Sequence, residues 1–175
     1  MNTNWKSFVL CGMILVASWL LLTSFTLVKT NDRNGKSVIL PQTLSTQIQK
    51  ESKGMTVMQI MDYSLDMTAQ LLKFTATNDI FHGKANCVGY AQLCSAICNK
   101  AFSINDYSCR AKPVVGYLKM SSINLCDLAK SVMPTTKMKN FVKDHDFVEL
   151  SYNGKTYYFD PSMYDYIGNK CWTIK

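Results

Sequence analysis

The sequence predicts an α+β domain, and three features of its pattern support this prediction. Apolar residues recur at helical spacing over residues 56–75, and a second helical stripe follows over residues 87–102. Residues 145–152 and 155–160 then alternate around Asn153-Gly154, a pair typical of a two-residue hairpin turn. Helices that come before the strands, instead of alternating with them, are typical of α+β folds.

Size and composition suit one such domain. The chain has 175 residues, of which 47% are apolar and 18% charged, and this composition argues against disorder and coiled coil. The net charge of +7 comes from basic residues that are scattered singly, without the Arg-rich stripe or the aromatic and basic motifs of nucleic-acid-binding domains. We therefore expect a charged, solvated surface and no nucleic-acid partner.

An uncharged apolar run occupies residues 8–28 and is long enough to cross a bilayer. We interpret it as a transmembrane anchor. A cleaved signal peptide is the alternative, because Lys6 and the small residues Thr23, Ser24 and Thr26 fit one. A buried core helix is a third interpretation. Residues 29–55 are polar and are expected to form a linker, which leaves residues 56–175 as the folded domain.

The orientation at the membrane depends on two opposing signals. Lys29, Arg33 and Lys36 follow the apolar run, and the positive-inside rule then favours a cytoplasmic C-terminal part. The short polar head before the run is typical of exported chains. We expect a membrane-anchored or secreted protein whose domain lies on the extracytoplasmic side.

The segments between the helices and the hairpin are less regular. Residues 78–86 are expected to form a loop in which Gly83 breaks regular structure. Residues 107–119 are β-rich, and Pro113 indicates an edge strand or a bulge. Residues 120–143 are expected to be an insertion that contains a short helix over 123–132.

The seven cysteines do not have the spacing of a disulfide-dense small domain. Cys94 and Cys98 share one face of the helix over 87–102, where thiols pack well as small core residues. A zinc site that adds Cys109 to this pair is an alternative. One disulfide among Cys109, Cys126 and Cys171 is a further expectation if the domain is exported.

Cys87 is the candidate nucleophile. It lies in the first turn of its helix, where free amide groups and the helix dipole favour a thiolate. A proton shuttle must come from His82 or His145. The Asn153-Gly154 turn places His145 and Asp160 on one face as diagonal neighbours, about 7–8 Å apart at Cα. Asp160 would then orient the imidazole toward the thiol.

The rest of the hairpin supports this choice. Val148, Leu150, Tyr157 and Phe159 fall on the opposite face of the hairpin and are expected to be core residues. His82 is interpreted as an ordinary loop histidine. The sequence therefore predicts a Cys87–His145–Asp160 triad built from one helix and one hairpin.

Three segments, of which two contain the triad residues, resemble the transglutaminase-like superfamily. Residues 83–97 (GKANCVGYAQLCSAI) are similar to its nucleophile helix, residues 109–117 (CRAKPVVGY) to the strand that follows, and residues 145–161 (HDFVELSYNGKTYYFDP) to its histidine strand and Asp-Pro ending. Phe147 stands where the family often has Trp. The resemblance covers about half of the chain and implies a papain-like core with the nucleophile helix packed on a small antiparallel sheet.

The resemblance also implies a chemistry. It implies acyl transfer on a peptide or protein substrate through a thioester at Cys87, ending in hydrolysis. The alternatives are transfer to an amine, as in cross-linking, and a catalytically silent module that binds a peptide or a cell-envelope partner. Asn86 and the Cys87 amide are the candidates for stabilising the oxyanion. No cofactor or metal is expected, since no acidic cluster has the spacing of a calcium loop.

Overall fold

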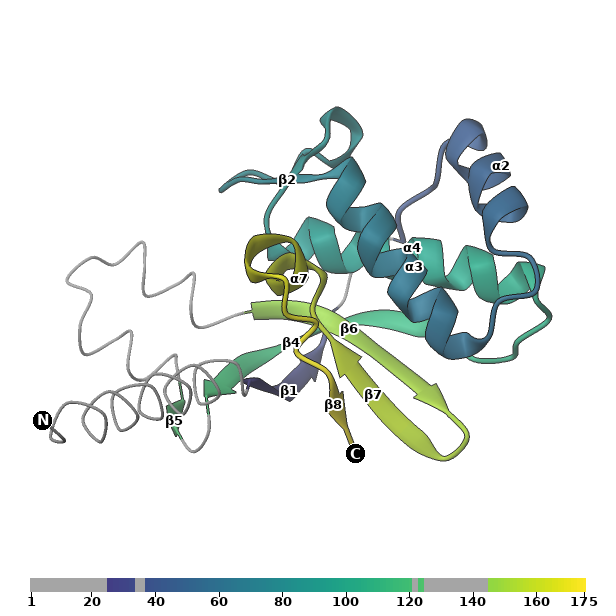
Figure 1. Ribbon diagram of the computed structural model, residues 1–175. Helices are drawn as coiled ribbons and strands as arrows, with labels where there is room; N and C mark the ends of the chain where they lie inside the picture. Colours follow the sequence, from purple (N-terminus) through teal and green to yellow (C-terminus); the bar gives the residue numbers. More distant parts are fainter. Residues whose placement is uncertain (1–24, 34–36, 121–122, 125–144) are drawn as a thin grey trace, which may run out of the picture.

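An antiparallel main sheet, a two-stranded parallel pair and a group of helices make up the described part of the protein (Figure 1). The computed structural model describes residues 25–33, 37–120, 123–124 and 145–175. The described helices are α2 (Gln42–Glu51), α3 (Val57–Leu71), α4 (Cys87–Ile104) and α7 (Pro161–Ile167), with a 3-10 turn η1 (Ile80–His82). The described strands are β1 (Phe25–Asp32), β2 (Lys73–Phe74), β3 (Lys84–Ala85), β4 (Ala111–Met120), β5 (Ile123–Asn124), β6 (His145–Tyr152), β7 (Lys155–Phe159) and β8 (Thr173–Ile174).

The main sheet has the strand order β1-β4-β6-β7-β8, with β5 paired to β4. All of its described pairs are antiparallel. The sheet curls, so that β1 and β8 meet although they are at opposite ends of the strand order. The Leu27 N–H of β1 donates to Thr173 Oγ1 of β8 at 2.9 Å. The α+β class predicted from the sequence is confirmed.

The two long helices form where the apolar periodicity predicts them. Thr56 begins α3 with a capping box, in which its side chain accepts from the Gln59 N–H and its own N–H donates to Gln59 Oε1. The helix ends at Leu71, four residues earlier than predicted, because Leu72 is already extended. Helix α4 begins at Cys87 as predicted and continues to Ile104.

The predicted hairpin is confirmed in both register and turn. Tyr152 pairs with Lys155 and Val148 with Phe159. Asn153 and Gly154 have φ values of 50° and 71°, as a type I′ turn requires. Because the register is fixed by this turn, the side chains of Val148 and Phe159 face the helices and are fully buried.

The sheet buries apolar side chains on both faces. The larger core lies between the sheet and helices α2, α3 and α4, and Ile60, Tyr90 and Phe102 are among its buried residues. A smaller cluster lies on the other face, inside the curl of the sheet; its buried members are Leu27, Val114, Phe147, Tyr158 and Cys171. The domain therefore has a helix-covered core and a second, smaller one.

Two of the expected boundaries are wrong. Phe25–Asp32 forms β1, so the last four residues of the expected membrane span belong to the sheet. Residues 29–55, expected as a linker, contain the end of β1 and all of α2. Helix α2 escaped detection because Ile48 is its only buried residue, which leaves no apolar stripe. No helix in the described ranges is long and apolar enough to cross a membrane, and residues 8–24 lie outside them.

Pro113 does not mark an edge strand, since β4 pairs with β1 on one side and with β6 on the other. It is tolerated because it lies just beyond Val114, the last β4 residue paired with β1. The ladder does contain a register shift, which falls between Lys29 and Asn31 of β1. The expected helix over 123–132 falls largely outside the described residues, and Ile123–Asn124 is a short strand.

Candidate active site

The thiol of Cys87 is held at a well-defined helix start. Asn86 is the N-cap of α4, and its Oδ1 accepts from the N–H groups of Val88 at 3.1 Å and Gly89 at 3.4 Å. The preceding loop is fixed by β2, since the Thr75 N–H donates to the Ala85 carbonyl at 2.8 Å. Cys87 itself is only 6% exposed. The sulfur therefore lies at a buried helix N-terminus on a fixed backbone.

His145 is the first residue of β6, opposite Gly116 of β4. Its side chain is 13% exposed, and its Nε2 forms a short hydrogen bond with Asp160 Oδ2. The contact is possible because both residues lie beyond Val148–Phe159, the last pair of the hairpin. The predicted His145–Asp160 juxtaposition is therefore present in the structure.

Asp160 uses both oxygens of its buried carboxylate. While Oδ2 faces His145, Oδ1 accepts from the Ser162 N–H at 3.0 Å, the Ser162 hydroxyl at 2.8 Å and the Met163 N–H at 3.0 Å. These bonds make Asp160 the N-cap of α7. This second function was not predicted from the sequence, although Asp before Pro at a helix start is a recognisable capping signal.

The thiol completes the cluster. Burial by itself lowers the pKa of His145, but the charge of Asp160 and hydrogen bonds to Asp160 and Cys87 outweigh it and raise this pKa to about 10. Because Nε2 is bonded to Asp160, Nδ1 is the ring nitrogen left for the Cys87 thiol. At neutral pH the imidazole is thus protonated and lies between a carboxylate and a thiol.

Comparison with protein-family models, with curated proteins and with solved structures finds no match for this chain.

A glycine and a phenylalanine set the position of the His145 ring. The Phe147 ring lies 6.4 Å from that of His145, at an interplanar angle of 30°. A Cβ added at Gly116 would come within 2.9 Å of the Phe147 ring and within 2.0 Å of the Val28 carbonyl oxygen. Only glycine therefore fits between β1 and this ring.

Helix α7 is tied to the helices beside it by polar contacts. The Tyr90 hydroxyl of α4 donates to Asp165 at 2.5 Å, and the Tyr164 hydroxyl forms a short hydrogen bond with Asp66 of α3. Lys170, just after α7, contacts Asp62 of α3. Since Asp160 caps α7, these contacts also fix the carboxylate that holds His145.

The other candidates from the sequence are separate from this cluster or have a different role in it. His82 is 80% exposed and is bonded to Asp79 at 2.9 Å in the loop before α4. The side-chain oxygen of Asn86, Oδ1, already accepts the hydrogen bonds that cap α4. The Cys87 N–H is at the first position of the helix, which has no intrahelical acceptor, so it remains a candidate for contact with an oxyanion together with the Asn86 amide nitrogen.

The structure does not support the metal or disulfide alternatives within its described residues. No three His, Cys, Asp or Glu side chains there could hold a metal ion, which argues against zinc at Cys94, Cys98 and Cys109. Cys109 and Cys171 are both free thiols, so the expected disulfide between these two cysteines is not formed. Burial raises the pKa of Cys94, Cys109 and Cys171, the first of these with a further contribution from Cys98.

One buried ion pair escaped the sequence analysis. Asp146, next to His145 in β6, is completely buried and bidentate with Arg33, with distances of 2.6 and 2.5 Å. An Asp within an alternating strand is the only signal that the sequence offers for it. This pair fixes β6 to the end of β1 one residue away from the histidine.

Proposed function

We propose that the protein is a thiol-dependent acyl-transfer enzyme of the transglutaminase-like type, which acts on peptide or amide substrates through Cys87. The observation that carries the proposal is the position of His145, whose Nε2 is bonded to the buried carboxylate of Asp160 and whose pKa is raised by both Asp160 and the Cys87 thiol. A nucleophile, a base and a residue that orients the base are the elements that such catalysis needs.

The proposed reaction has two stages. The Cys87 sulfur attacks the substrate carbonyl carbon and forms a C–S bond, and His145 gives its proton to the leaving amine as the C–N bond breaks. His145 then removes a proton from water as the water oxygen bonds to the thioester carbonyl carbon. The C–S bond breaks, and the acid is released together with the Cys87 thiolate beside the protonated imidazole. Asp160 keeps the ring oriented throughout, and the Cys87 N–H is the candidate donor to the oxyanion.

Water is the preferred acceptor in this proposal. Transfer to an amine needs a site that binds the second substrate beside the thioester, and no such site is identified in the described residues. A silent binding module is the alternative of another class. Against it, three interacting side chains of matched type have no evident use in a module that only binds a partner.

Attachment to a membrane is also part of the proposal, with its position corrected by the fold. Because β1 begins at Phe25, an anchor or signal would end before that residue, within the apolar residues 8–24. The domain would then act close to the membrane surface, on the extracytoplasmic side.

A competition between two thiols tests the catalytic proposal. Cys109 is more exposed than Cys87, so accessibility alone predicts faster alkylation of Cys109. An activated Cys87 reverses this order, because an ordinary thiol is ionised only to a few per cent at pH 7. The full chain is treated with iodoacetamide, and both sites are followed by peptide mass spectrometry.

We expect Cys87 to be labelled faster than Cys109. In the His145→Gln variant the labelling of Cys87 should slow, while the labelling rate of Cys109 should stay the same. The His82→Gln variant is the matched control and should label as the unmodified protein does. Faster labelling of Cys109 in the unmodified protein would leave Cys87 a structural cysteine and would end the proposal.

A further inference from the structure

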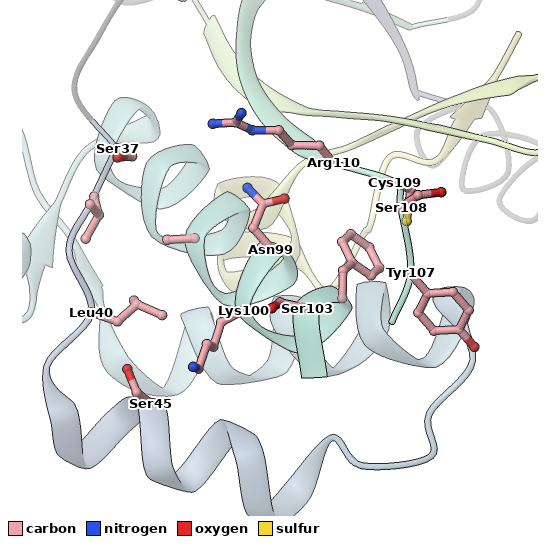
Figure 2. Close-up of a pocket in the computed structure, with 13 residues that line it drawn as sticks. Ser37, Leu40, Ser45, Asn99, Lys100, Ser103, Tyr107, Ser108, Cys109 and Arg110 are labelled. Atoms are coloured by element: carbon pink, nitrogen blue, oxygen red, sulfur yellow. The ribbon is translucent and has the colours of Figure 1, made fainter. Parts of the chain in front are cut away.

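Two adjoining cavities lie along α4 and include none of the residues of the proposed catalytic site. One of about 670 Å³ lies between residues 37–45, the C-terminal half of α4 and residues 107–110 (Figure 2). The other, of about 370 Å³, extends from it toward β4 and Arg33. Their shared walls are Ser37, Val38, Ala96, Asn99 and Arg110. These volumes match the usual range for small-molecule sites.

The described walls of both cavities carry positive charge and no carboxylate. Four cationic side chains line them: Arg33, Lys100, Arg110 and Lys112. Arg33 and Lys112 are already paired with carboxylates. Arg110 and Lys100 have no such partner within the described part of the chain, so their charges are left for a ligand.

A buried hydroxyl gives independent evidence for a ligand. Ser95 is 3% exposed and lines the smaller cavity, yet its Oγ has no hydrogen-bond partner among the described residues. A buried polar group without a partner costs free energy. An acceptor oxygen in the smaller cavity would remove this cost once the Ser95 hydroxyl turns toward it.

The cavity walls are held in place by the fold itself. The Asn99 side chain accepts from the Ala111 N–H and donates to the Ala111 carbonyl, both at 2.8 Å, and so fixes the start of β4 beside Arg110. In Figure 2 the Arg110 side chain extends above Asn99 toward Ser37, while Lys100 lies at the opposite end near Ser45. The two cations are therefore presented at separate positions on one fixed frame.

The larger cavity also has an apolar side. Val38, Leu40, Phe102 and Tyr107 line it. Tyr107 is anchored from both sides, since its ring packs edge-on against Phe102 and its hydroxyl donates to the Met55 carbonyl at 3.2 Å. A ligand that matches these walls combines an anionic group with an organic part.

We propose that these cavities bind a small organic anion, whose phosphate or carboxylate group is recognised by Arg110 and Ser95 and whose organic part lies against Val38 and Leu40. The guanidinium supplies a planar pair of donors suited to either group. This site does not depend on the proposed acyl transfer, because no residue of the catalytic cluster lines it.

Matched probes separate the two anionic groups. Phenyl phosphate and benzoate share an aromatic ring and differ in the charged group, and benzyl alcohol is the uncharged control. Binding of each to the full chain is measured by titration calorimetry at low ionic strength, where such contacts are least screened. We expect at least one of the two anions to bind and benzyl alcohol to bind at least tenfold more weakly, and the tighter anion identifies the group.

Variants then locate the site. We expect Arg110→Gln to weaken the binding of that anion at least tenfold, and Lys155→Gln, which removes an exposed charge at the hairpin turn, to change it less than twofold. Ser95→Ala should weaken binding without lowering the melting temperature, because its hydroxyl has no partner to lose. Cys87→Ser should bind as the unmodified protein does.

Several outcomes would overturn the proposal. They are the absence of binding by both anions, equal binding of benzyl alcohol, and an equal loss in the Arg110→Gln and Lys155→Gln variants, which would indicate non-specific attraction to a basic protein. Unchanged binding in Ser95→Ala would overturn the assignment of the buried hydroxyl. None of these outcomes bears on the alkylation of Cys87, so the two proposals fail separately.

Discussion

Asp160 joins two tasks in one carboxylate, because it caps α7 through Oδ1 and orients His145 through Oδ2. An asparagine in its place keeps a carbonyl oxygen for the cap, and Asn is as good an N-cap as Asp. Its amide nitrogen would face His145, however, and would favour the wrong tautomer. The two tasks can therefore be separated by substitution.

We expect Asp160→Asn to keep the cap of α7 but to unfold at a lower temperature at pH 7, because the charge that holds the His145 proton is gone. Alkylation of Cys87 at pH 7 should fall at least about tenfold, because the thiolate fraction drops toward that of an ordinary thiol. Asp160→Ala should lose the same reactivity and about 1 kcal/mol or more of stability from the missing cap. Thermal unfolding measures the stability of the two variants, and alkylation rates measure the reactivity of Cys87. Normal alkylation of Cys87 in Asp160→Asn would contradict the orienting role.

His145 should make stability depend on pH. Its pKa in the folded protein, about 10, lies above the ordinary value of 6.5, so the folded state holds the proton more tightly. The resulting stabilisation is complete below about pH 6.5 and is lost as the pH rises through about 10. Cys87→Ser is the suitable background, because a thiolate formed beside the imidazolium would cancel the proton difference between the folded and unfolded states.

In Cys87→Ser the charge of Asp160 still raises the His145 pKa although the contribution of the thiol is lost, so we expect the free energy of unfolding to fall between pH 7 and 8, by up to about 1 kcal/mol per pH unit. The double variant Cys87→Ser/His145→Gln should show a nearly flat profile over the same range. Urea titrations at three pH values give both slopes. Equal slopes in the two proteins would mean that the folded structure does not hold the His145 proton.

At the level of single residues, the hairpin turn made the site predictable. Asn153-Gly154 fixes the register, and the register decides which side chains accompany His145. The capping role of Asp160 and the ion pair of Asp146 were not predicted. They depend on chain segments that meet only in three dimensions, and an alternating pattern does not tell a paired buried Asp from an exposed one.

Among the elements, β4 is the one that positions the site from both sides. It lies between β1 and β6, and Gly116 is opposite His145. The backbone of β1 and the Phe147 ring approach Gly116 so closely that no side chain fits there. The position of His145 therefore depends on the close packing of β1, Gly116 and the Phe147 ring, in which no polar side chain takes part.

We expect Gly116→Ala to destabilise the protein by about 1–3 kcal/mol, as overpacking does in other cores. Alkylation of Cys87 should slow as well, since Phe147 must move and its ring contacts His145. Gly54→Ala is the control: a Cβ there meets nothing within 4 Å, and its φ of 82° costs about 1–2 kcal/mol through the backbone alone. Urea unfolding and alkylation rates are compared for both variants.

The two variants should differ in the alkylation rate of Cys87. Gly54→Ala should leave Cys87 alkylation unchanged even though it lowers stability. A normal alkylation rate in Gly116→Ala would show that β6 holds the imidazole without help from β4.

Elements with strong local patterns were predictable, and those without were not. Helices α3 and α4 bury broad apolar faces that are visible as periodicity. Strand β1 lies at the end of an apolar run, and its partner β4 comes more than eighty residues later. Since nothing local separates a strand from a membrane span in such a run, only the pairing reveals the strand.

For the molecule as a whole, the curl of the sheet brings distant parts of the chain together. Strand β1 contacts β8 through Leu27 and Thr173, and a second apolar cluster fills the space inside the curl. The Arg33–Asp146 pair joins the end of β1 to β6 across β4. The first described strand is thus part of the frame that holds His145, although it is far from it in sequence.

Removal of Arg33 tests how strongly this strand supports the fold. Asp146 is fully buried, and a buried carboxylate that loses its partner typically costs about 3–5 kcal/mol. Because the Arg33 side chain is 30% exposed, we expect Arg33→Ala to destabilise the protein toward the lower end of this range. Lys112→Ala breaks an exposed contact to Asp32 and a contact to the buried Glu149, which keeps Lys29 as a partner, and should cost about 1 kcal/mol or less. Urea unfolding followed by circular dichroism gives both values.

Adding Asp146→Asn to Arg33→Ala should recover part of the lost stability, because the unpaired buried charge is then gone. A double variant that is no more stable than Arg33→Ala would instead assign the loss to the missing packing of the arginine side chain.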